Sequence, residues 1–346
     1  MAIIDKPSDY FNTKLYTGNG STQSFTGVGF QPDLIWVKSR SNTEPHIWTD
    51  VVRGANKNIR SNATSSEFTD ANNITSFDSD GFSVGTGGAV NENTYTFASW
   101  NWKAGTSFTN DASATGIGSI DSSGSVNTDA GFSIVSFTAG GANATVAHGL
   151  GAVPKMIIVK CRAASSTWSV YHASLGATKF LRLEDTSAVG TEAGWWNNTT
   201  PTSSVFTIGG NHSANTQIAY CFAEKQGYSK FGSYTGNGNA DGTFVYTGFS
   251  PAFVMVKRTN SANSWNIKDN RRNNASTSFN INPRNATLLP NDSAADQDAN
   301  ALDFLSNGFK NRSTGNDANN SSGTYIYMAF ASNPLVTSTG VPATAR

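Results

Sequence analysis

The strongest constraint on the fold is a short strand signal that this chain contains three times. Each copy has a proline, one spacer residue, four apolar residues and a lysine. The copies are PDLIWVK at 32–38, PKMIIVK at 154–160 and PAFVMVK at 251–257. Proline cannot donate a hydrogen bond to a neighbouring strand, so it suits the first position of a strand. The apolar run predicts a strand covered on both faces, and we expect the lysine to end it at the surface.

Other signals recur at matched distances after each of these segments. A tryptophan follows each lysine, and a second apolar strand closes each copy with an aromatic residue. The repeat signature consists of Pro32, Trp48 and Trp100 in the first copy, Pro154, Trp168 and Phe222 in the second, and Pro251, Trp265 and Phe330 in the third. YTGNG occurs at 16–20 and at 234–238, and we interpret it as an entrance hairpin that has diverged to FTAGG at 137–141. Repetition at this spacing predicts a triplicated architecture.

The repeated units are too long for a solenoid and match separate all-β domains. Short apolar segments between Asn-, Gly- and Ser-rich turns are typical of antiparallel β-sandwiches of the jelly-roll type. We therefore predict three tandem antiparallel β-sandwich domains. The predicted organisation is an N-terminal arm at 1–12, unit 1 at 13–104, a flexible linker at 105–130, unit 2 at 131–227, unit 3 at 228–332 and an extended tail at 333–346. Helix is expected only at 296–304, for a turn or two.

Composition narrows the functional classes. Charged residues make up 14% of the chain, the formal net charge is zero, and aromatic residues reach 11%. This mixture argues against a largely disordered chain and gives little support for nucleic-acid binding. The chain starts without a signal-peptide pattern and has no apolar run that could span a membrane, so we expect a soluble protein made in the cytoplasm. Cys161 and Cys221 form no CxxC motif and are predicted to be buried thiols.

The chemistry-bearing residues favour no enzyme class. The four histidines are scattered over the first two units without a G-x-S-x-G motif, which disfavours a nucleophilic triad. They are His46, His148, His172 and His212. Glutamates are rare and no carboxylate pair is singled out for glycoside hydrolysis, although aspartates could supply one. Asp78-Ser79-Asp80-Gly81 resembles the start of a calcium loop but lacks the later bidentate acid, so a turn is the preferred interpretation. We predict no catalytic residue, metal site or cofactor.

Aromatic residues supply the candidate ligand site. Trp195 and Trp196 lie in the polar segment EAGWWNN at 192–198. Adjacent residues of a strand point to opposite faces, so we expect one ring in the core and the other exposed as a lid or platform. An exposed ring beside Asn side chains could stack on a sugar, with packing against a neighbouring unit or subunit as the alternative. The other repeated tryptophans, Trp48, Trp168 and Trp265, and the pair Trp100 and Trp102 are assigned to the core.

Several longer segments carry a resemblance to a known group of proteins. They are AYCFAEKQGYSKFGSYTGNG at 219–238 with its continuation to Lys257-Arg258, DFLSNGFK at 303–310, GTYIYMAF at 323–330, and DYFNT at 9–13 with the first YTGNG. Together they resemble a repeat module of virion proteins in tailed phages, especially phages of marine bacteria and cyanobacteria. The likeness covers nearly the whole chain. It implies a virion structural protein with concanavalin-like or jelly-roll sandwiches, associated with the tail or its fibres.

The resemblance carries over no catalytic residues, and it implies a homo-oligomer, with a trimer favoured. Such modules often follow a long anchoring segment, so here either the short N-terminal arm is the anchor or the units dock directly on a partner. We expect a virion protein that is adhesin-like, contacts other virion proteins, and binds a host surface glycan for host attachment, without nucleic-acid binding or membrane insertion. A decoration or spike protein of the capsid or collar is the alternative. A polysaccharide depolymerase is the second alternative.

Overall fold

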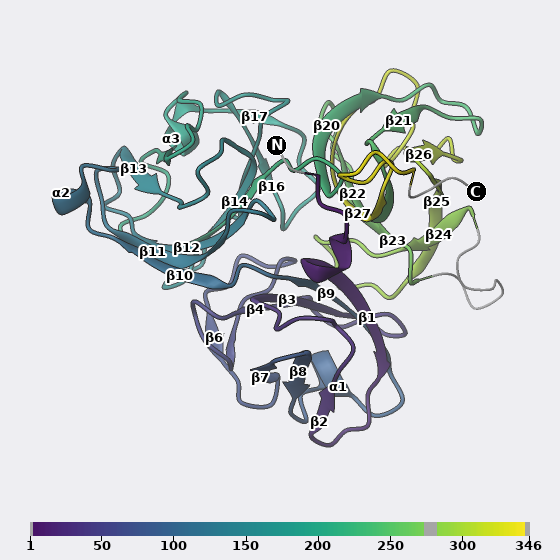
Figure 1. The fold of residues 1–346 in the computed structure, drawn as a ribbon, viewed down its shortest axis with the longest axis horizontal. Helices are drawn as coiled ribbons and strands as arrows, with labels where there is room; N and C mark the ends of the chain where they lie inside the picture. The colour runs from purple at the N-terminus through teal and green to yellow at the C-terminus, as the bar shows by residue number, and fades with distance from the viewer. Residues whose placement is uncertain (1–2, 273–281, 343–346) are drawn as a thin grey trace.

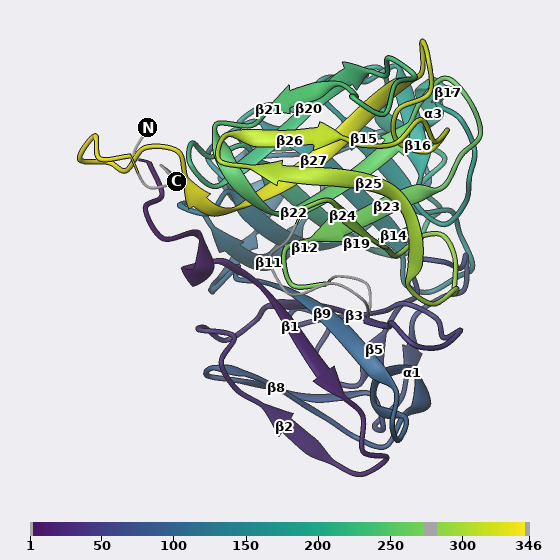
Figure 2. The same cartoon turned by 90° about the vertical axis from the view of Figure 1, so that its right-hand side faces the viewer.

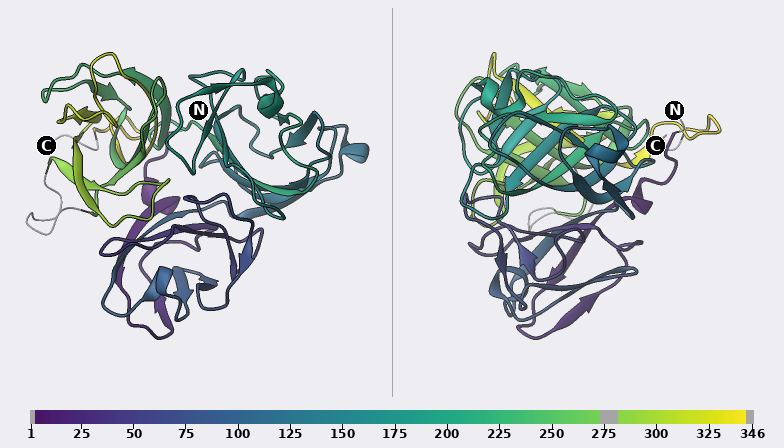
Figure 3. Two further views of the ribbon diagram at one scale, coloured as in Figure 1. Left: turned by 180° about the vertical axis from the view of Figure 1, so that it is seen from behind. Right: turned by 90° about the vertical axis from the view of Figure 1, so that its left-hand side faces the viewer.

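The computed structural model describes residues 3–272 and 282–342. Its elements are almost all antiparallel β-strands, as the turn-rich sequence predicts. Figure 1 shows three lobes around a common centre: lobe 1 (residues 3–104), lobe 2 (105–227) and lobe 3 (228–342). The view from behind in Figure 3 shows the same arrangement. Within the described residues, no helix is both long and apolar enough to cross a membrane.

Lobe 1 is built around a four-stranded sheet. Its elements are η1 (Pro7–Asp9), β1 (Phe11–Thr17), β2 (Gln23–Phe25), β3 (Leu34–Ser39), β4 (Ile47–Asp50), β5 (Lys57–Asn58), β6 (Phe68–Thr69), β7 (Ile74–Asp78), β8 (Gly81–Val84), α1 (Gly88–Asn91) and β9 (Thr96–Trp102). The larger sheet has the order β1-β9-β3-β4, and a smaller sheet has the order β2-β8-β7. Strands β5 and β6 pair separately.

Lobe 2 contains the largest sheet. Its elements are β10 (Thr106–Asn110), α2 (Ala112–Thr115), β11 (Ser122–Asn127), β12 (Phe132–Thr138), β13 (Ala144–Ala147), β14 (Pro154–Cys161), β15 (Ser169–His172), β16 (Lys179–Arg182), β17 (Gly190–Thr191), α3 (Ala193–Trp196), β18 (Val205–Ile208) and β19 (Thr216–Ala223). Eight strands form the order β10-β11-β12-β19-β14-β15-β16-β17, and β13 pairs with β18.

Lobe 3 has two four-stranded sheets. Its elements are β20 (Ser229–Thr235), β21 (Phe244–Tyr246), β22 (Phe249–Arg258), β23 (Trp265–Asp269), β24 (Arg284–Thr287), β25 (Gln297–Leu305), β26 (Gly308–Asn311) and β27 (Thr324–Pro334). The sheets have the orders β20-β27-β22-β23 and β21-β26-β25-β24. The first order repeats β1-β9-β3-β4 of lobe 1 and the central β12-β19-β14-β15 of lobe 2, so the predicted triplication is present in the strand topology.

Alternate residues of the repeated strand serve two hydrophobic cores. In β3, Leu34 and Trp36 belong to a central core that collects side chains from all three lobes, whereas Ile35 and Val37 belong to an outer core of lobe 1. Lobes 2 and 3 have corresponding outer cores. Because both faces of the strand are covered, it is apolar at four consecutive positions, as predicted. Each lobe therefore has its own outer core and contributes to one shared core.

Strand pairing corrects one member of the predicted signature. Trp265 lies opposite Lys257, but the register of β3 and β4, continued one residue beyond the pair Val37–Ile47, places His46 and not Trp48 opposite Lys38. The equivalent residues of the three lobes are His46, Trp168 and Trp265. Side chains two positions apart on a strand share a face, so Trp48 is still buried in the central core.

The closing aromatic residue of lobe 1 is corrected in the same way. Trp102, not Trp100, pairs with the residue two positions after the repeated proline, as Phe222 and Phe330 do in their lobes. Both tryptophans are buried and contribute to the central core. A two-residue shift preserves the face, so an aromatic pattern alone does not distinguish the two positions.

The two YTGNG segments do not form hairpins. Strands β1 and β2 belong to different sheets, as do β20 and β21, so each segment crosses from one sheet to the other. A buried asparagine holds each crossing: Asn91 Oδ1 accepts a hydrogen bond from Asn19 N at 3.1 Å, and Asn319 Oδ1 accepts one from Asn237 N at 3.1 Å. A Cβ atom on Gly18 would overlap a backbone carbonyl oxygen. The motif is repeated because the crossing is repeated.

Residues 105–130 are not the predicted linker. Strands β10 and β11 extend the sheet of lobe 2 beyond β12, with α2 between them. The strand β11 is rich in serine, and it pairs through its backbone, so its composition resembled that of a loop. Residues 297–305 also differ from expectation, because they form β25 rather than a helical turn.

The first and last segments of the described chain lie at one end of the molecule (Figure 2). Ser338 N donates to Asp5 Oδ1 at 2.6 Å, and Ile4 N donates to Gln226 O at 3.2 Å. Lobes 2 and 3 are joined directly, because β19 ends at residue 223 and β20 begins at residue 229. The N-terminal segment therefore runs beside this short connection.

Candidate functional site

The three lysines of the repeat are buried rather than exposed, with a relative accessibility of 0% each. Lys160 Nζ donates to Thr64 O at 2.7 Å and Lys257 Nζ donates to Thr186 O at 2.9 Å, and each carbonyl belongs to another lobe. Lys38 Nζ donates to carbonyl oxygens of its own loop. Burial lowers the pKa of each ammonium group to about 8. The surface prediction was wrong because a neighbouring lobe covers the strand end.

The loop that follows each lysine contacts the lobe that precedes it in the chain, and the loop of lobe 1 contacts lobe 3. Backbone hydrogen bonds run from Glu44 N to Ser293 O at 3.0 Å, from Ser166 N to Thr64 O at 2.8 Å, and from Asn263 N to Thr186 O at 2.8 Å. Lobe 1 thus donates to lobe 3, lobe 2 to lobe 1, and lobe 3 to lobe 2. These are head-to-tail contacts that close a ring within one chain.

The His46, Trp168 and Trp265 positions follow the same direction. Trp168 Nε1 donates to Arg60 O at 3.0 Å, and Trp265 Nε1 donates to Arg182 O at 2.7 Å. The ring nitrogen Nε2 of His46 lies 2.9 Å from Leu289 O. The repeated position therefore places a ring nitrogen against a backbone carbonyl of the same neighbouring lobe that the loop contacts, which is a structural role.

A buried ion pair lies where lobe 2 meets lobe 1. Arg53 Nε is 2.5 Å from Asp50 Oδ2, and neither side chain is exposed. The hydroxyl of Tyr220, from lobe 2, donates to the same carboxylate oxygen at 2.7 Å. A buried charge is tolerated only when it is paired and hydrogen-bonded, and this carboxylate meets both conditions.

The same arrangement recurs where lobe 1 meets lobe 3. Arg272 Nε is 2.5 Å from Asp269 Oδ2, both side chains are fully buried, and Trp100 Nε1 of lobe 1 donates to that oxygen at 2.9 Å. Desolvation raises the pKa of Asp269, but the Arg272 charge and the hydrogen bonds outweigh it and hold the pKa below its ordinary value. The carboxylate is therefore ionised in the fold.

The third contact of the ring has a different chemistry. His172 occupies the register position of the two aspartates, and its Nε2 lies 3.2 Å from Tyr327 O of lobe 3. Met328 occupies the position of the Tyr and Trp donors. A methionine has no N–H or O–H to donate, so a carboxylate here would lack its partner. The acceptor and the donor are both replaced.

Ion pairs near the surface also occur at the contacts of lobe 1 with lobes 2 and 3. Arg162 Nε of lobe 2 is 3.0 Å from Glu67 Oε2 of lobe 1, and Arg40 Nε of lobe 1 is 2.8 Å from Asp296 Oδ2 of lobe 3. The equivalent position in lobe 3 is Thr259, whose carbonyl accepts a hydrogen bond from the lobe 2 backbone. Two contacts of the ring have an ion pair at this position, and the third has a backbone hydrogen bond there instead.

All four histidines are buried, and they do not form a catalytic group. Burial lowers the pKa of His148, His172 and His212 to about 4. His212 Nε2 is 3.0 Å from Ser169 Oγ, but both residues are buried, and Nδ1 faces a backbone carbonyl rather than a carboxylate. The pair lacks the orienting acid and the access that a nucleophilic serine needs.

Trp195 and Trp196 do not form an exposed platform. They belong to the short helix α3 rather than to a strand, and their relative accessibilities are 7% and 1%. The ring of Trp195 packs on Phe180, the ring of Trp196 packs on Tyr171, and both contact His212. The polar sequence around them suggested exposure, but the outer core of lobe 2 covers both rings, so neither is free to stack on a sugar.

Other candidate ligand groups are used within the fold. Asp80 accepts hydrogen bonds from Gly27 N and Gly29 N, and Asp78 accepts from two serine hydroxyls, as expected for a turn. Among residues 3–272 and 282–342, no three His, Cys, Asp or Glu side chains are placed to share a metal ion. Cys161 and Cys221 are buried free thiols, as predicted.

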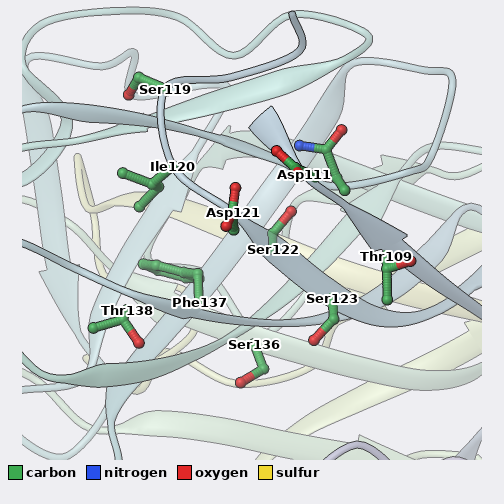
Figure 4. Close-up of a pocket in the computed structure, with 11 residues that line it drawn as sticks. Thr109, Asp111, Ser119, Ile120, Asp121, Ser122, Ser123, Ser136, Phe137 and Thr138 are labelled. Atoms are coloured by element: carbon green, nitrogen blue, oxygen red, sulfur yellow. The ribbon is translucent and has the colours of Figure 1, made fainter. Parts of the chain in front are cut away.

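An open groove of about 740 Å³ lies over β10, β11 and β12 (Figure 4). Its lining includes the hydroxyl groups of Thr109, Ser119, Ser122, Ser123, Ser136 and Thr138. Its two carboxylates fold the adjacent turn: Asp111 caps α2, and Asp121 Oδ1 accepts from Ala112 N at 2.9 Å. Its aromatic lining residue, Phe137, is 3% exposed. The groove offers hydroxyl groups but no ring face to a ligand.

The model of a family described as a domain of unknown function, DUF7483, matches residues 6–334. This chain belongs to the DUF7483 family. The matched span of the DUF7483 chain covers all three lobes as one unit, in agreement with their shared core. Comparisons with curated proteins and with solved structures found no match.

Sequence reasoning missed the residues that join the lobes. A usable signal was present in two copies: an aspartate followed three positions later by an arginine, at 50–53 and 269–272. The second copy has no such pair, because His172 stands at that position. The signal was therefore absent from one of the three copies and was not recognised as part of the repeat.

Proposed function

We propose that this chain is a structural protein of a bacteriophage virion, associated with the tail or its fibres and adhesin-like in contacting a host surface glycan. We also propose that each lobe is a β-sandwich whose layers are its larger sheet and its smaller outer sheets. One observation carries the proposal: the aromatic residues and lysines of the repeat are buried in the shared core or at contacts between lobes. A repeat used in this way specifies a rigid shape and surface rather than a reactive centre.

A capsid or collar decoration protein is the alternative that the same architecture favours. A closed ring of three similar lobes with zero formal net charge suits packing among symmetric neighbours. The tail role is preferred because the sequence resemblance points to tail-associated modules. A depolymerase would require a carboxylate pair at a ligand site, and the two carboxylates of the Figure 4 groove are engaged in folding α2.

Antibody labelling of intact phage particles that encode this chain tests the proposal. We expect gold particles on the tail or fibres in negative-stain images. Label on the head or collar would replace the tail role by the decoration role, and particles without label would contradict a virion function. A reducing-end assay on host polysaccharide incubated with the purified protein should remain at the blank value, and a rising signal would identify a depolymerase.

We propose other virion proteins as partners, and a homotrimer as the oligomer. Head-to-tail contacts between lobes are satisfied within the chain, so a trimer would use outer surfaces of the lobes. Light scattering on the purified protein should give the mass of three chains. The mass of a single chain would contradict the homotrimer and would show that the three lobes form a ring within a monomer.

A further inference from the structure

A second groove, of about 570 Å³, lies at the junction of lobes 2 and 3. Lobe 2 supplies Val153 and Lys155, the short connection supplies residues 223–227, and lobe 3 supplies Ser229, Lys230 and residues 246–248. Figure 1 shows β14 and β20, which carry parts of this lining, on the adjacent sides of the two lobes. The groove is built from both lobes, and its shape depends on their fixed contact.

An exposed aromatic ring marks this groove. Tyr246 has a relative accessibility of 57%, in contrast to the buried aromatic residues of the repeat. It lies on β21, the edge strand of its sheet, where Val245 points into the core and Phe244 is also exposed, at 42%. An exposed apolar ring at the rim of a concave surface is a feature of binding sites, because its burial by a ligand releases water. The same ring can stack on the apolar face of a sugar.

The lining of the groove is positively charged. It contains Lys155, Lys225 and Lys230 with one carboxylate, Glu224. Lys230 Nζ is 2.7 Å from Glu224 Oε1, and within the described chain neither of the other two lysines forms an ion pair. Lys225 also lines an adjoining hollow that contains three aspartates. Among the described residues, Lys155 is therefore the lysine of this lining that neither forms an ion pair nor lines the adjoining hollow.

The position of Lys155 is a departure of lobe 2 from the repeat. It is the spacer residue between the repeated proline and the apolar run. The spacer of lobe 1 is Asp33, which is buried and accepts a hydrogen bond from Ala104 N at 2.7 Å, and the spacer of lobe 3 is Ala252. Lys155 makes no such internal contact among the described residues, so the charge at this position is not explained by the fold.

We propose that this groove binds an acidic saccharide, with a sugar ring against Tyr246 and a carboxylate or phosphate group of the saccharide near Lys155. The proposal rests on the glycan-binding part of the proposed function and names the site and the ligand class. The Figure 4 groove and the Trp195–Trp196 pair are disfavoured, because neither presents an exposed ring. A neutral glycan would leave the lysines of the groove uncompensated.

Affinity electrophoresis of the full-length protein tests this assignment. The probes are polygalacturonate, an acidic polysaccharide; dextran, a neutral one; and polyglutamate, an acidic polymer without sugar rings. We expect retardation by polygalacturonate and none by dextran. Tyr246→Ala and Lys155→Gln should each weaken the apparent affinity at least about tenfold, as truncation of a central contact does, and Tyr246→Phe should retain it. Lys57→Gln on lobe 1 removes the same charge elsewhere and should have no effect.

Three outcomes would overturn the assignment. Polygalacturonate could fail to retard the wild-type protein, the groove variants could bind as well as Lys57→Gln does, or polyglutamate could bind as strongly as polygalacturonate. The first excludes the ligand class, the second places the site elsewhere, and the third reduces the interaction to net charge. None of them bears on the labelling of virions, so failure here is distinguishable from failure of the virion role.

Discussion

Lobes 1 and 3 have a buried aspartate–arginine ion pair where they contact a neighbouring lobe, whereas lobe 2 has a buried histidine at the equivalent position. At the same register position, Asp50 and Asp269 are each paired with an arginine and accept a hydrogen bond from a Tyr or Trp of a neighbouring lobe. Lobe 2 has His172, which contacts a backbone carbonyl and has no arginine three residues later. The comparison teaches that the ring requires satisfied hydrogen bonds at this position, not a particular charge.

The largest expected difference concerns this position. Asp269→Ala removes one of the two carboxylates that pair with the buried guanidinium of Arg272 and leaves only Asp296, and it should lower the free energy of unfolding by about 3–5 kcal/mol. His172→Ala removes a neutral group, and it should cost about 1–3 kcal/mol. Urea unfolding of both variants against wild type measures the two values. Equal losses would refute the distinction between ionic and neutral contacts.

The histidine contact and the aspartate–arginine contacts should respond differently to a decrease in pH. Burial lowers the pKa of His172 to about 4, against about 6.5 in the unfolded chain, so between these values only the unfolded state binds the proton. Stability contributed by this residue is therefore present above pH 6.5 and falls by about 3 kcal/mol as the pH drops to 4. The pKa of Asp269 is also lowered, but for a carboxyl group this means that the fold favours the charged form. The stability contributed by Asp269 is therefore lost only as the pH falls below the ordinary carboxyl range.

The measurement is the difference in unfolding free energy between wild type and His172→Gln across this pH range. Glutamine keeps an N–H donor but does not titrate, so the wild type should lose stability relative to the variant as the pH drops from 6.5 to 4. Asp269→Asn is the matched control at the equivalent position, and its difference from wild type should stay constant in that window. A flat difference for His172→Gln would contradict burial of the neutral imidazole.

The smallest effect is expected at the crossing turns. Gly18→Ala places a methyl group against a backbone carbonyl and should cost about 1–3 kcal/mol. Lobe 2 already has Ala139 at this position, where the backbone N–H makes the equivalent hydrogen bond, to Asn215 O at 3.0 Å. Ala139→Gly should therefore cost less than about 1 kcal/mol. Thermal unfolding of both variants provides the test, and a tolerated alanine at position 18 would remove this distinction.

The local signals in the sequence predicted the local structure. A proline, an apolar run and a later aromatic strand are neighbours in one sheet, so the three copies and their all-β character were visible without coordinates. The contacts between lobes were not visible, because they join residues far apart in the chain. From the sequence we expected Lys160 at the surface, but in the structure it donates a hydrogen bond to the carbonyl oxygen of Thr64 in lobe 1.

The candidate site was predicted less well than the fold. Trp195 and Trp196 stand among polar residues, and their burial depends on how α3 folds back onto β15 and β16 of lobe 2. Tyr246 lies in a stretch that reads as an ordinary strand, and its exposure follows from its place on an edge. Neither outcome is encoded in a pattern of neighbouring residues.

Closure of the ring within one polypeptide makes its assembly a unimolecular step, so dilution does not separate the lobes. In a homotrimer of identical single-lobe subunits, every substitution would occur in all three subunits. Fused copies allow histidine and methionine to replace a charged group at one contact only, and allow two strands to be added to one lobe only. A nearly symmetric frame can thereby carry the groove that we propose as a ligand site at the junction of lobes 2 and 3 without repeating it at the other junctions.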